Sequence, residues 1–302
     1  MFAGSRPFVI HDADRQPLLS ALLHYPTEAP SRPTAFGPYE LDVSVAAPLA
    51  PGRHPVVLIS HGSGGSPLLY RSLSLLLARH GYLVVLPRHP GNSLGDNALA
   101  DSSENLRNRP RHLVALLDAL LADAEFGAAA APEPVTAVGH SLGGSTVLSL
   151  AGGRPTTRSG SPVEVAPDPR VGALVLMAPA CGFFLAPGAL QQVSAPLLTL
   201  TAEHDPLTPD SEIRVALAGV PDQSRISIRT VPNAGHFSFL SPFPRSMHNP
   251  QFAPARDPSG FDRERFHRWF PGFILEWIDE RRRERGVGGI SVASGARGSS
   301  SG

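Results

Sequence analysis

Apolar residues occur along the chain in short runs that alternate with longer stretches of helical periodicity. Short apolar runs bounded by turn residues are typical of buried strands, whereas apolar positions three and four apart are typical of amphipathic helices. The alternation predicts an α/β protein with a mostly parallel central sheet and helices on both faces. The predicted strands are residues 56–60, 82–86, 135–138, 171–177, 196–200 and 225–230, of which the last has an edge-strand pattern.

Helical periodicity predicts five helices, at residues 68–80, 111–126, 143–151, 209–219 and 261–285. Gly81 fits a C-cap of the first helix. Pro110 fits the first turn of the second helix, since proline at that position loses no intrahelical hydrogen bond. Pro271 predicts a kink in the last helix, whose aromatic positions indicate core packing.

The rest of the chain is expected to be less regular. Residues 8–11 and 18–25 predict one or two antiparallel strands, followed by a proline-rich connection. No internal repeat interrupts residues 1–285, which are expected to form one domain. Two long irregular segments, 153–169 and 241–260, are candidate pocket rims, because long loops within compact domains are often functional. The low-complexity segment 286–302 is predicted to be a disordered tail.

The segment GHSLG at 139–143 matches the pattern G-x-S-x-G between a predicted strand and a predicted helix. In that context the pattern forms a sharp turn that lifts the serine hydroxyl clear of the sheet. The flanking glycines are needed because the turn leaves no room for neighbouring side chains. We therefore expect Ser141 to be a nucleophile and the amide of Leu142 to face the same point in space.

A serine hydroxyl becomes nucleophilic when a base removes its proton, and a carboxylate orients that base. With a G-x-S-x-G elbow, the three residues follow in the order serine, acid, histidine. Asp205 lies just past a predicted strand end, where active sites of parallel sheets form, and His236 lies in a small-residue loop after the last strand. The less favoured candidates are Glu203, Asp210, Asp222 and Asp168 for the acid, and His204, His248 and His267 for the base.

Acyl transfer also needs two backbone donors at the position where negative charge develops. The loop HGSGGS at 61–66 follows the first predicted parallel strand and is expected to supply the amide of Ser63, with that of Leu142 as the second donor. No G-K-[ST] follows the glycines, which argues against nucleotide binding. Candidate substrate contacts are Gly64, His140, Phe183 and Phe237. Phe184 and Phe239 are further candidates for the lining of an acyl pocket, and two of the four phenylalanines could equally be core residues.

Composition narrows the remaining classes of function. The 302 residues carry 26 basic and 26 acidic side chains, so no excess charge points to nucleic acid or an anionic membrane. The single cysteine, Cys181, excludes an intrachain disulfide and a cysteine-based zinc site. No histidine spacing is typical of a metal site, and no cofactor is expected. Without a secretory signal pattern or an apolar run of membrane-spanning length, a cytoplasmic protein is expected.

Several segments together resemble the serine hydrolases related to platelet-activating-factor acetylhydrolases and the "predicted dienelactone hydrolase" group. The resemblance covers residues 56–277 and is carried by HGSGG, YRSLSLLLARHGYLVVLPRHPGN, NRPRH, GHSLGGST and AGHFSFL. It implies an α/β-hydrolase fold, a triad of Ser141, Asp205 and His236, and no metal. True dienelactone hydrolases use a cysteine nucleophile, so their substrate does not transfer to this chain. The loop after His236 also lacks the cysteines that some relatives carry.

The sequence thus predicts a serine hydrolase that cleaves a small-molecule carboxylic ester through an acyl-enzyme. An amidase or peptidase, a lactonase or a thioesterase would use the same residues, because all pass through the same kind of tetrahedral intermediate. A hypothesis of another class is a non-catalytic binding protein that retains the hydrolase fold. The acyl group, the alcohol and the oligomeric state stay open at this level.

Overall fold

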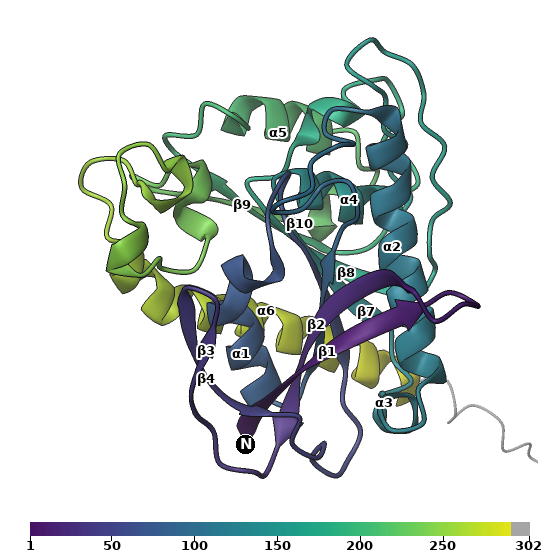
Figure 1. Ribbon diagram of the computed structural model, residues 1–302. Helices are drawn as coiled ribbons and strands as arrows, with labels where there is room; N and C mark the ends of the chain where they lie inside the picture. Colours follow the sequence, from purple (N-terminus) through teal and green to yellow (C-terminus); the bar gives the residue numbers. More distant parts are fainter. Residues whose placement is uncertain (291–302) are drawn as a thin grey trace, which may run out of the picture.

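The computed structural model describes residues 1–290, and its ten strands form one sheet in the order β10-β9-β8-β7-β5-β6-β2-β1-β4-β3 (Figure 1). Strands β5 to β10 pair in parallel, whereas β2 joins β6 and β1 in antiparallel pairing. The strands are β1 Phe2–His11, β2 Pro17–Thr27, β3 Arg32–Phe36, β4 Tyr39–Val45, β5 Val56–Ser60, β6 Leu83–Arg88, β7 Val135–His140, β8 Val171–Met177, β9 Leu197–Ala202 and β10 Ile226–Val231.

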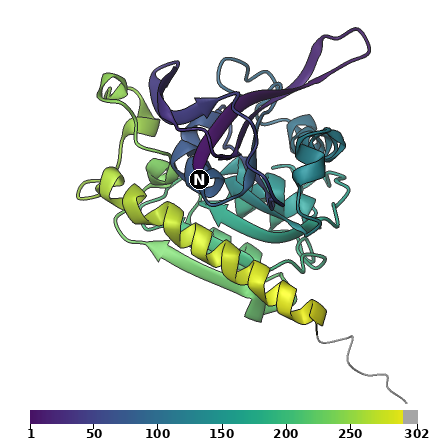
Figure 2. The same cartoon turned by 90° about the horizontal axis from the view of Figure 1, so that it is seen from below.

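Successive residues of the central strands enter two different cores, because side chains of a strand alternate between the two faces of a sheet. In β5, Val56 and Leu58 enter one core while Val57 and Ile59 enter the other. The first core packs against α2, α4 and α5, and the second against α1 and α6; Figure 2 shows α6 as the long yellow helix. The helices are α1 Arg71–Arg79, α2 Ser103–Ala122, α3 Phe126–Ala129, α4 Leu142–Leu150, α5 Asp210–Leu217 and α6 Arg263–Ile290.

Helix α2 begins at Ser103, well before the predicted start at residue 111, so the prediction that Pro110 occupies the first turn is wrong. The Ser102 hydroxyl caps the helix by accepting a hydrogen bond from the Asn105 amide at 3.0 Å. An interior proline removes one intrahelical hydrogen bond and crowds the preceding turn. The cap and the burial of the apolar face of α2, including Leu113, Leu116 and Leu117, act against that cost.

The proline-rich connection expected before residue 55 contains two further strands, β3 and β4. Strand β4 reads YELDVSV, in which Tyr39, Leu41 and Val43 are buried and alternate with exposed residues. This period-two pattern was hidden by the surrounding prolines in the sequence. Strand β4 pairs in parallel with β1 at two positions and therefore extends the sheet beyond the hairpin.

Helix α6 continues to Ile290 and thus includes the first five residues of the segment predicted to be a disordered tail. A helix that is already packed against the sheet extends readily, because each added residue forms one further backbone hydrogen bond. Residues 291–302 of that predicted tail lie outside the described residues. Within residues 1–290, no helix combines the length and the apolar character needed to cross a membrane.

Candidate active site

Ser141 occupies a sharp turn between β7 and α4, with φ 54° and ψ −122°. This left-handed conformation is strained for a residue with a side chain. Two flanking glycines make the turn possible: a Cβ atom on Gly139 would overlap the backbone of Gly143, and one on Gly143 would overlap the Ser60 carbonyl. The glycines of the G-x-S-x-G pattern are therefore required by the close approach of α4 to β5 and β7.

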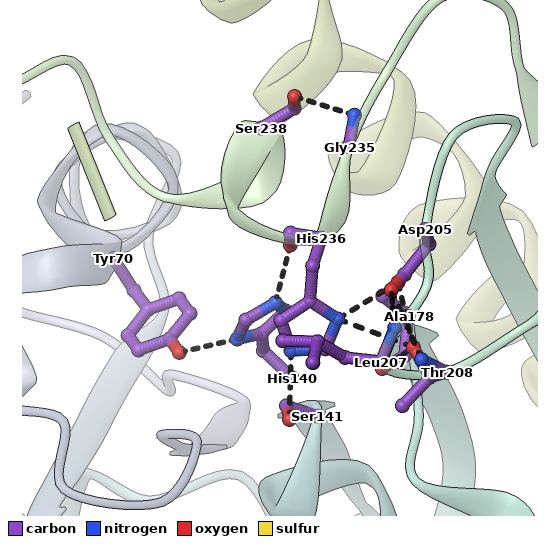
Figure 3. Close-up of polar contacts among 10 residues, drawn as sticks. All are labelled: Tyr70, His140, Ser141, Ala178, Asp205, Leu207, Thr208, Gly235, His236 and Ser238. Atoms are coloured by element: carbon purple, nitrogen blue, oxygen red, sulfur yellow. Dashed lines mark hydrogen bonds and ion pairs between the residues drawn. The ribbon is translucent and has the colours of Figure 1, made fainter. Parts of the chain in front are cut away.

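Three side chains from separate loops form a continuous hydrogen-bonded line (Figure 3). Nε2 of His236 lies 2.9 Å from Oγ of Ser141, and Nδ1 of His236 lies 2.7 Å from Oδ2 of Asp205. The Asp205 carboxylate accepts a hydrogen bond from the N–H at Nδ1, so Nε2 carries no proton and can accept a hydrogen bond from the serine hydroxyl. Asp205 follows β9, and His236 opens a short turn after β10, so both lie at the carboxyl edge of the sheet.

The Asp205 carboxylate is held by more than its histidine partner. It accepts hydrogen bonds from the Thr208 hydroxyl at 2.6 Å, and from the amides of Leu207 and Thr208 at 2.8 and 3.0 Å. Burial acts to raise the pKa of Asp205, but the hydrogen bonds from His236 and Thr208 outweigh it, and the pKa lies below its usual value. The carboxylate is therefore ionised at neutral pH, buried, and fixed in orientation.

The other candidates named from the sequence do not contact this line of residues. The Glu203 carboxylate accepts a hydrogen bond from the Asn233 amide, and the Asp210 carboxylate pairs with Arg214. The remaining acids and two of the histidines are committed elsewhere: Asp168 to Arg170, Asp222 to Arg225, His248 to the Phe243 carbonyl and His267 to the Ser238 carbonyl. His204 has no side-chain hydrogen bond within the described residues, and it makes none to Ser141 or Asp205.

The two amides proposed as donors lie on either side of the serine. The loop after β5 approaches the elbow so closely that a Cβ atom on Gly62 would lie 3.2 Å from Cβ of Ser141. Leu142 is the first residue of α4, where backbone N–H groups have no intrahelical acceptor. Among the residues that the structure describes, neither the Ser63 amide nor the Leu142 amide has a protein acceptor.

A buried arginine, Arg109, contacts the residues around this site. Its only mark in the sequence is its place in the segment NRPRH, since no residue spacing singles it out. Arg109 is fully buried. Its guanidinium donates to Ser60 Oγ at 3.2 Å, Asn92 Oδ1 at 2.7 Å, Thr146 Oγ1 at 3.0 Å and the His61 carbonyl. Burial lowers the pKa of Arg109 to about 9, which leaves the group charged at neutral pH. None of these acceptors is a carboxylate.

The partners of Arg109 in turn contact both amide-bearing segments. The Asn92 amide group donates to Ser63 Oγ at 3.0 Å. The Thr146 hydroxyl donates to the Leu142 carbonyl at 2.9 Å. Arg109 thus connects the loop after β5 with the first turn of α4 through one rigid, planar group.

A cavity of about 320 Å³ opens beside Ser141, and no lysine, arginine, aspartate or glutamate side chain lines it. Gly64, His140 and Phe237, three of the predicted substrate contacts, line this cavity. The predicted rim 241–260 contributes residues as well. The apolar lining consists of Tyr39, Leu69, Tyr70, Leu94, Leu207, Phe237, Leu240, Met247, Phe252 and Pro254.

Phe183 does not line this cavity, so the prediction of a contact there is wrong. It packs instead with Leu142 and Leu106 in a small separate cluster. Its direction follows from the short turn after β8, which points it to the α2 side of the elbow. Phe184 and Phe239 are buried in the two cores, and the segment 153–169 lines a different surface pocket.

Besides the serine, a cysteine thiol or a cluster of metal-ligating side chains could carry out chemistry. Cys181 is buried, and burial raises the pKa of its thiol above the usual value, which disfavours the reactive thiolate. Within residues 1–290, the structure places no three histidine, cysteine, aspartate or glutamate side chains so that they could hold a metal ion. The described residues therefore concentrate their reactive groups around Ser141.

Comparison with known proteins supports the architecture. The family model described as "Alpha/beta hydrolase family" matches residues 56–199. A solved structure of a ferulic acid esterase from Streptomyces cinnamoneus superimposes with a TM-score of 0.69 and 21% sequence identity, over 92% of this chain and 89% of that chain. No curated protein sequence matches the chain. The chain therefore has the α/β-hydrolase fold, with the sequence pattern of the α/β-hydrolase family over residues 56–199.

Proposed function

We propose that the protein is a serine hydrolase that cleaves a carboxylic ester through an acyl-enzyme on Ser141. The observation that carries this proposal is the hydrogen-bonded line from Ser141 through His236 to Asp205, with 2.9 and 2.7 Å between the bonded atoms. It starts at a strained serine beside an open cavity. A serine, a base and an orienting acid in this geometry are the parts that nucleophilic acyl transfer requires.

In the first half of the reaction, His236 takes the hydroxyl proton as Oγ of Ser141 attacks the ester carbonyl carbon. Asp205 holds the imidazole in the required tautomer and stabilises its charged form. The carbonyl oxygen becomes an oxyanion, to which the Ser63 and Leu142 amides donate. The bond to the alcohol oxygen then breaks, and His236 returns its proton to that oxygen.

In the second half, His236 removes a proton from water, and the hydroxide oxygen attacks the acyl carbon. The tetrahedral intermediate collapses, Oγ of Ser141 leaves, and it regains its proton from His236. The carboxylic acid is released, and the enzyme returns to its starting state. The same donors stabilise both intermediates, so each contributes twice in a cycle.

The lining of the cavity favours a substrate that is uncharged and has an apolar portion. It is lined mostly by leucine, phenylalanine, methionine and tyrosine side chains, and a charged acyl group would lose its hydration there without an ion partner. The Asp205 carboxylate does not line the cavity, and it is already hydrogen-bonded to His236, so it is not a partner for a charged substrate group. We propose Gly64 and Phe237 as substrate contacts. The resemblance to the platelet-activating-factor acetylhydrolase group remains a prediction.

A panel of p-nitrophenyl esters of graded acyl length tests the proposal when it is run on the wild type and on Ser141→Ala together. Hydrolysis by the wild type alone, with labelling of Ser141 by a fluorophosphonate, is the expected result. Faster turnover of the matched anilides, lactones or thioesters would move the protein to one of the alternative hydrolase classes. Absence of both labelling and hydrolysis in folded protein would indicate a binding protein instead.

A further inference from the structure

A second chain of hydrogen bonds crosses the site beside the first one (Figure 3). The Gly62 amide donates to the Tyr70 hydroxyl at 3.2 Å, and the same hydroxyl lies 3.0 Å from Nδ1 of His140. Nε2 of His140 lies 2.9 Å from the carbonyl oxygen of His236. The chain begins in the loop that carries the proposed Ser63 donor and ends on the backbone of the proposed base.

The chemistry of its ends determines the direction of every bond in this chain. A carbonyl oxygen can only accept a hydrogen bond. Nε2 of His140 therefore carries a proton and donates a hydrogen bond to the His236 carbonyl. Burial and the neighbouring His236 lower the pKa of His140 to about 3, so the ring is neutral and Nδ1 is an acceptor. The Tyr70 hydroxyl therefore donates to Nδ1 and accepts from Gly62, and burial raises its pKa, which keeps the proton on it.

From these contacts we infer that Tyr70 and His140 are positioning residues. They hold the loop after β5, which carries the Ser63 amide, and the backbone of His236 at fixed positions relative to Ser141. The inference rests on the proposed function. His140 directly precedes Ser141 and packs against the His236 ring, with 4.9 Å between the ring centroids. A shift of any one of the three segments would break a bond of the chain, and small displacements of catalytic groups reduce acyl-transfer rates strongly.

The chain also selects which amide of the loop faces the substrate. The Gly62 N–H is occupied by Tyr70, while the Gly62 carbonyl accepts from the Gly65 amide and pairs with the His61 ring. Because both polar groups of Gly62 are bonded, its amide is not available to an oxyanion, whereas the next amide, that of Ser63, has no protein acceptor among the described residues. A phenylalanine at position 70 would fill the same space without making this selection.

The test removes one hydroxyl oxygen atom and compares a tyrosine of the site with a buried tyrosine outside it. Tyr70→Phe is expected to lower kcat for a p-nitrophenyl ester about tenfold, with KM within about twofold of the wild type. Tyr25→Phe is the matched control, because Tyr25 is also buried, its hydroxyl donates a hydrogen bond to the Ala47 carbonyl at 2.7 Å, and it does not line the cavity. Tyr25→Phe is expected to leave kcat within about twofold, although it also removes one hydrogen bond from the fold.

A double-mutant cycle asks whether Tyr70 acts through His140. His140→Asn keeps an acceptor oxygen near the Nδ1 position but removes the donor to the His236 carbonyl. If the chain is a unit, Tyr70→Phe costs less than about threefold in kcat when it is made in the His140→Asn background. Active-site titration of each variant with a fluorophosphonate counts the competent sites and separates a lost rate from lost folding.

Two results would overturn the inference. One is a Tyr70→Phe variant as active as Tyr25→Phe, and the other is a full tenfold effect of Tyr70→Phe in the His140→Asn background. Either result can be seen only if the wild type hydrolyses the ester. An inactive wild type would instead contradict the proposed function.

Discussion

Oγ of Ser141 lies 2.9 Å from Nε2 of His236, although 95 residues separate them in the chain. The contact exists because β7 and β10 belong to the same parallel sheet and end at the same edge. Each residue also has contacts other than this one that hold it in place: the glycine turn holds Ser141, and Asp205 and His140 hold His236. The two are thus placed before any substrate binds, as efficient acyl transfer requires.

The strained backbone at Ser141 leads to a prediction about stability. Ser141→Ala and Ser141→Gly should both lose activity by about 10⁴-fold or more. Ser141→Gly should nevertheless unfold at a higher temperature than Ser141→Ala, because glycine adopts φ 54° without strain. Relief of about 1–3 kcal/mol of strain exceeds the entropic cost of glycine, which is about 0.5–1 kcal/mol. Thermal unfolding of the two variants in parallel checks this order, and equal melting temperatures would show that the turn is unstrained.

The two acids after β9 should differ sharply in their effect on turnover. Asp205→Asn should retain the fold and lower kcat about 10⁴-fold, because the amide favours the wrong tautomer of His236. Glu203→Gln should keep near-normal activity, since the Glu203 carboxylate contacts the Asn233 amide rather than His236. Steady-state kinetics on both variants decide the assignment. High activity in Asp205→Asn together with loss in Glu203→Gln would transfer the acid role to Glu203.

Addition of a methyl group should have opposite effects at two helical glycines. Gly143→Ala places Cβ against the Ser60 carbonyl and should destabilise the protein by about 3 kcal/mol or more. Gly272→Ala, in α6, meets no atom within 4 Å and should stabilise by about 0.5–1 kcal/mol, since alanine is the better helix former. Urea unfolding of the two variants provides the comparison. A Gly143→Ala protein as stable as the wild type would mean that α4 is not tightly packed against β5.

Buried neutral histidines should make the fold sensitive to acid. Burial lowers the pKa values of His24, His61 and His140 to about 3, below the ordinary value of 6.5. The unfolded chain therefore binds more protons than the folded one between pH 6.5 and about 3, and stability falls as the pH drops through that window. At pH 5 each such histidine costs about 2 kcal/mol of the stability present above pH 6.5.

His24→Asn isolates one of these groups away from the site, because His24 packs under α1 with Nδ1 at 2.9 Å from Ser74 Oγ. The loss in unfolding free energy between pH 7 and pH 5, measured by urea titration, should be about 2 kcal/mol smaller in this variant than in the wild type. The same change at the exposed His11 serves as the control. An identical loss in the His24→Asn and wild-type proteins would contradict the prediction.

Much of the frame could be predicted from local patterns in the sequence. All six predicted parallel strands form, with ends shifted by no more than two residues at Val135–His140, Leu83–Arg88, Leu197–Ala202 and Ile226–Val231. Buried strands and a glycine-flanked serine have local signatures, because they depend on periodicity and on backbone space within a few residues. Chain order and a position just after a strand predict Asp205 as the acid and His236 as the base, and both features can be found in the sequence. The proline-rich start of the chain hid β3 and β4, since its prolines masked their alternation.

The sequence by itself thus determined the parallel sheet, the elbow at Ser141 and a short set of candidates for its partners. Only the tertiary structure decided which candidates meet: Asp205 rather than Glu203, Phe237 rather than Phe183, and Tyr70 with His140 across 70 residues. The hydrogen bond from Arg109 to Ser60, 49 residues away, likewise exists only in the folded protein. The physical reason is that hydrogen bonds and cavity walls depend on distances across the sheet and between loops. Such distances are determined by strand order and packing. Local periodicity predicts neither of them, because it depends only on residues close together in the sequence.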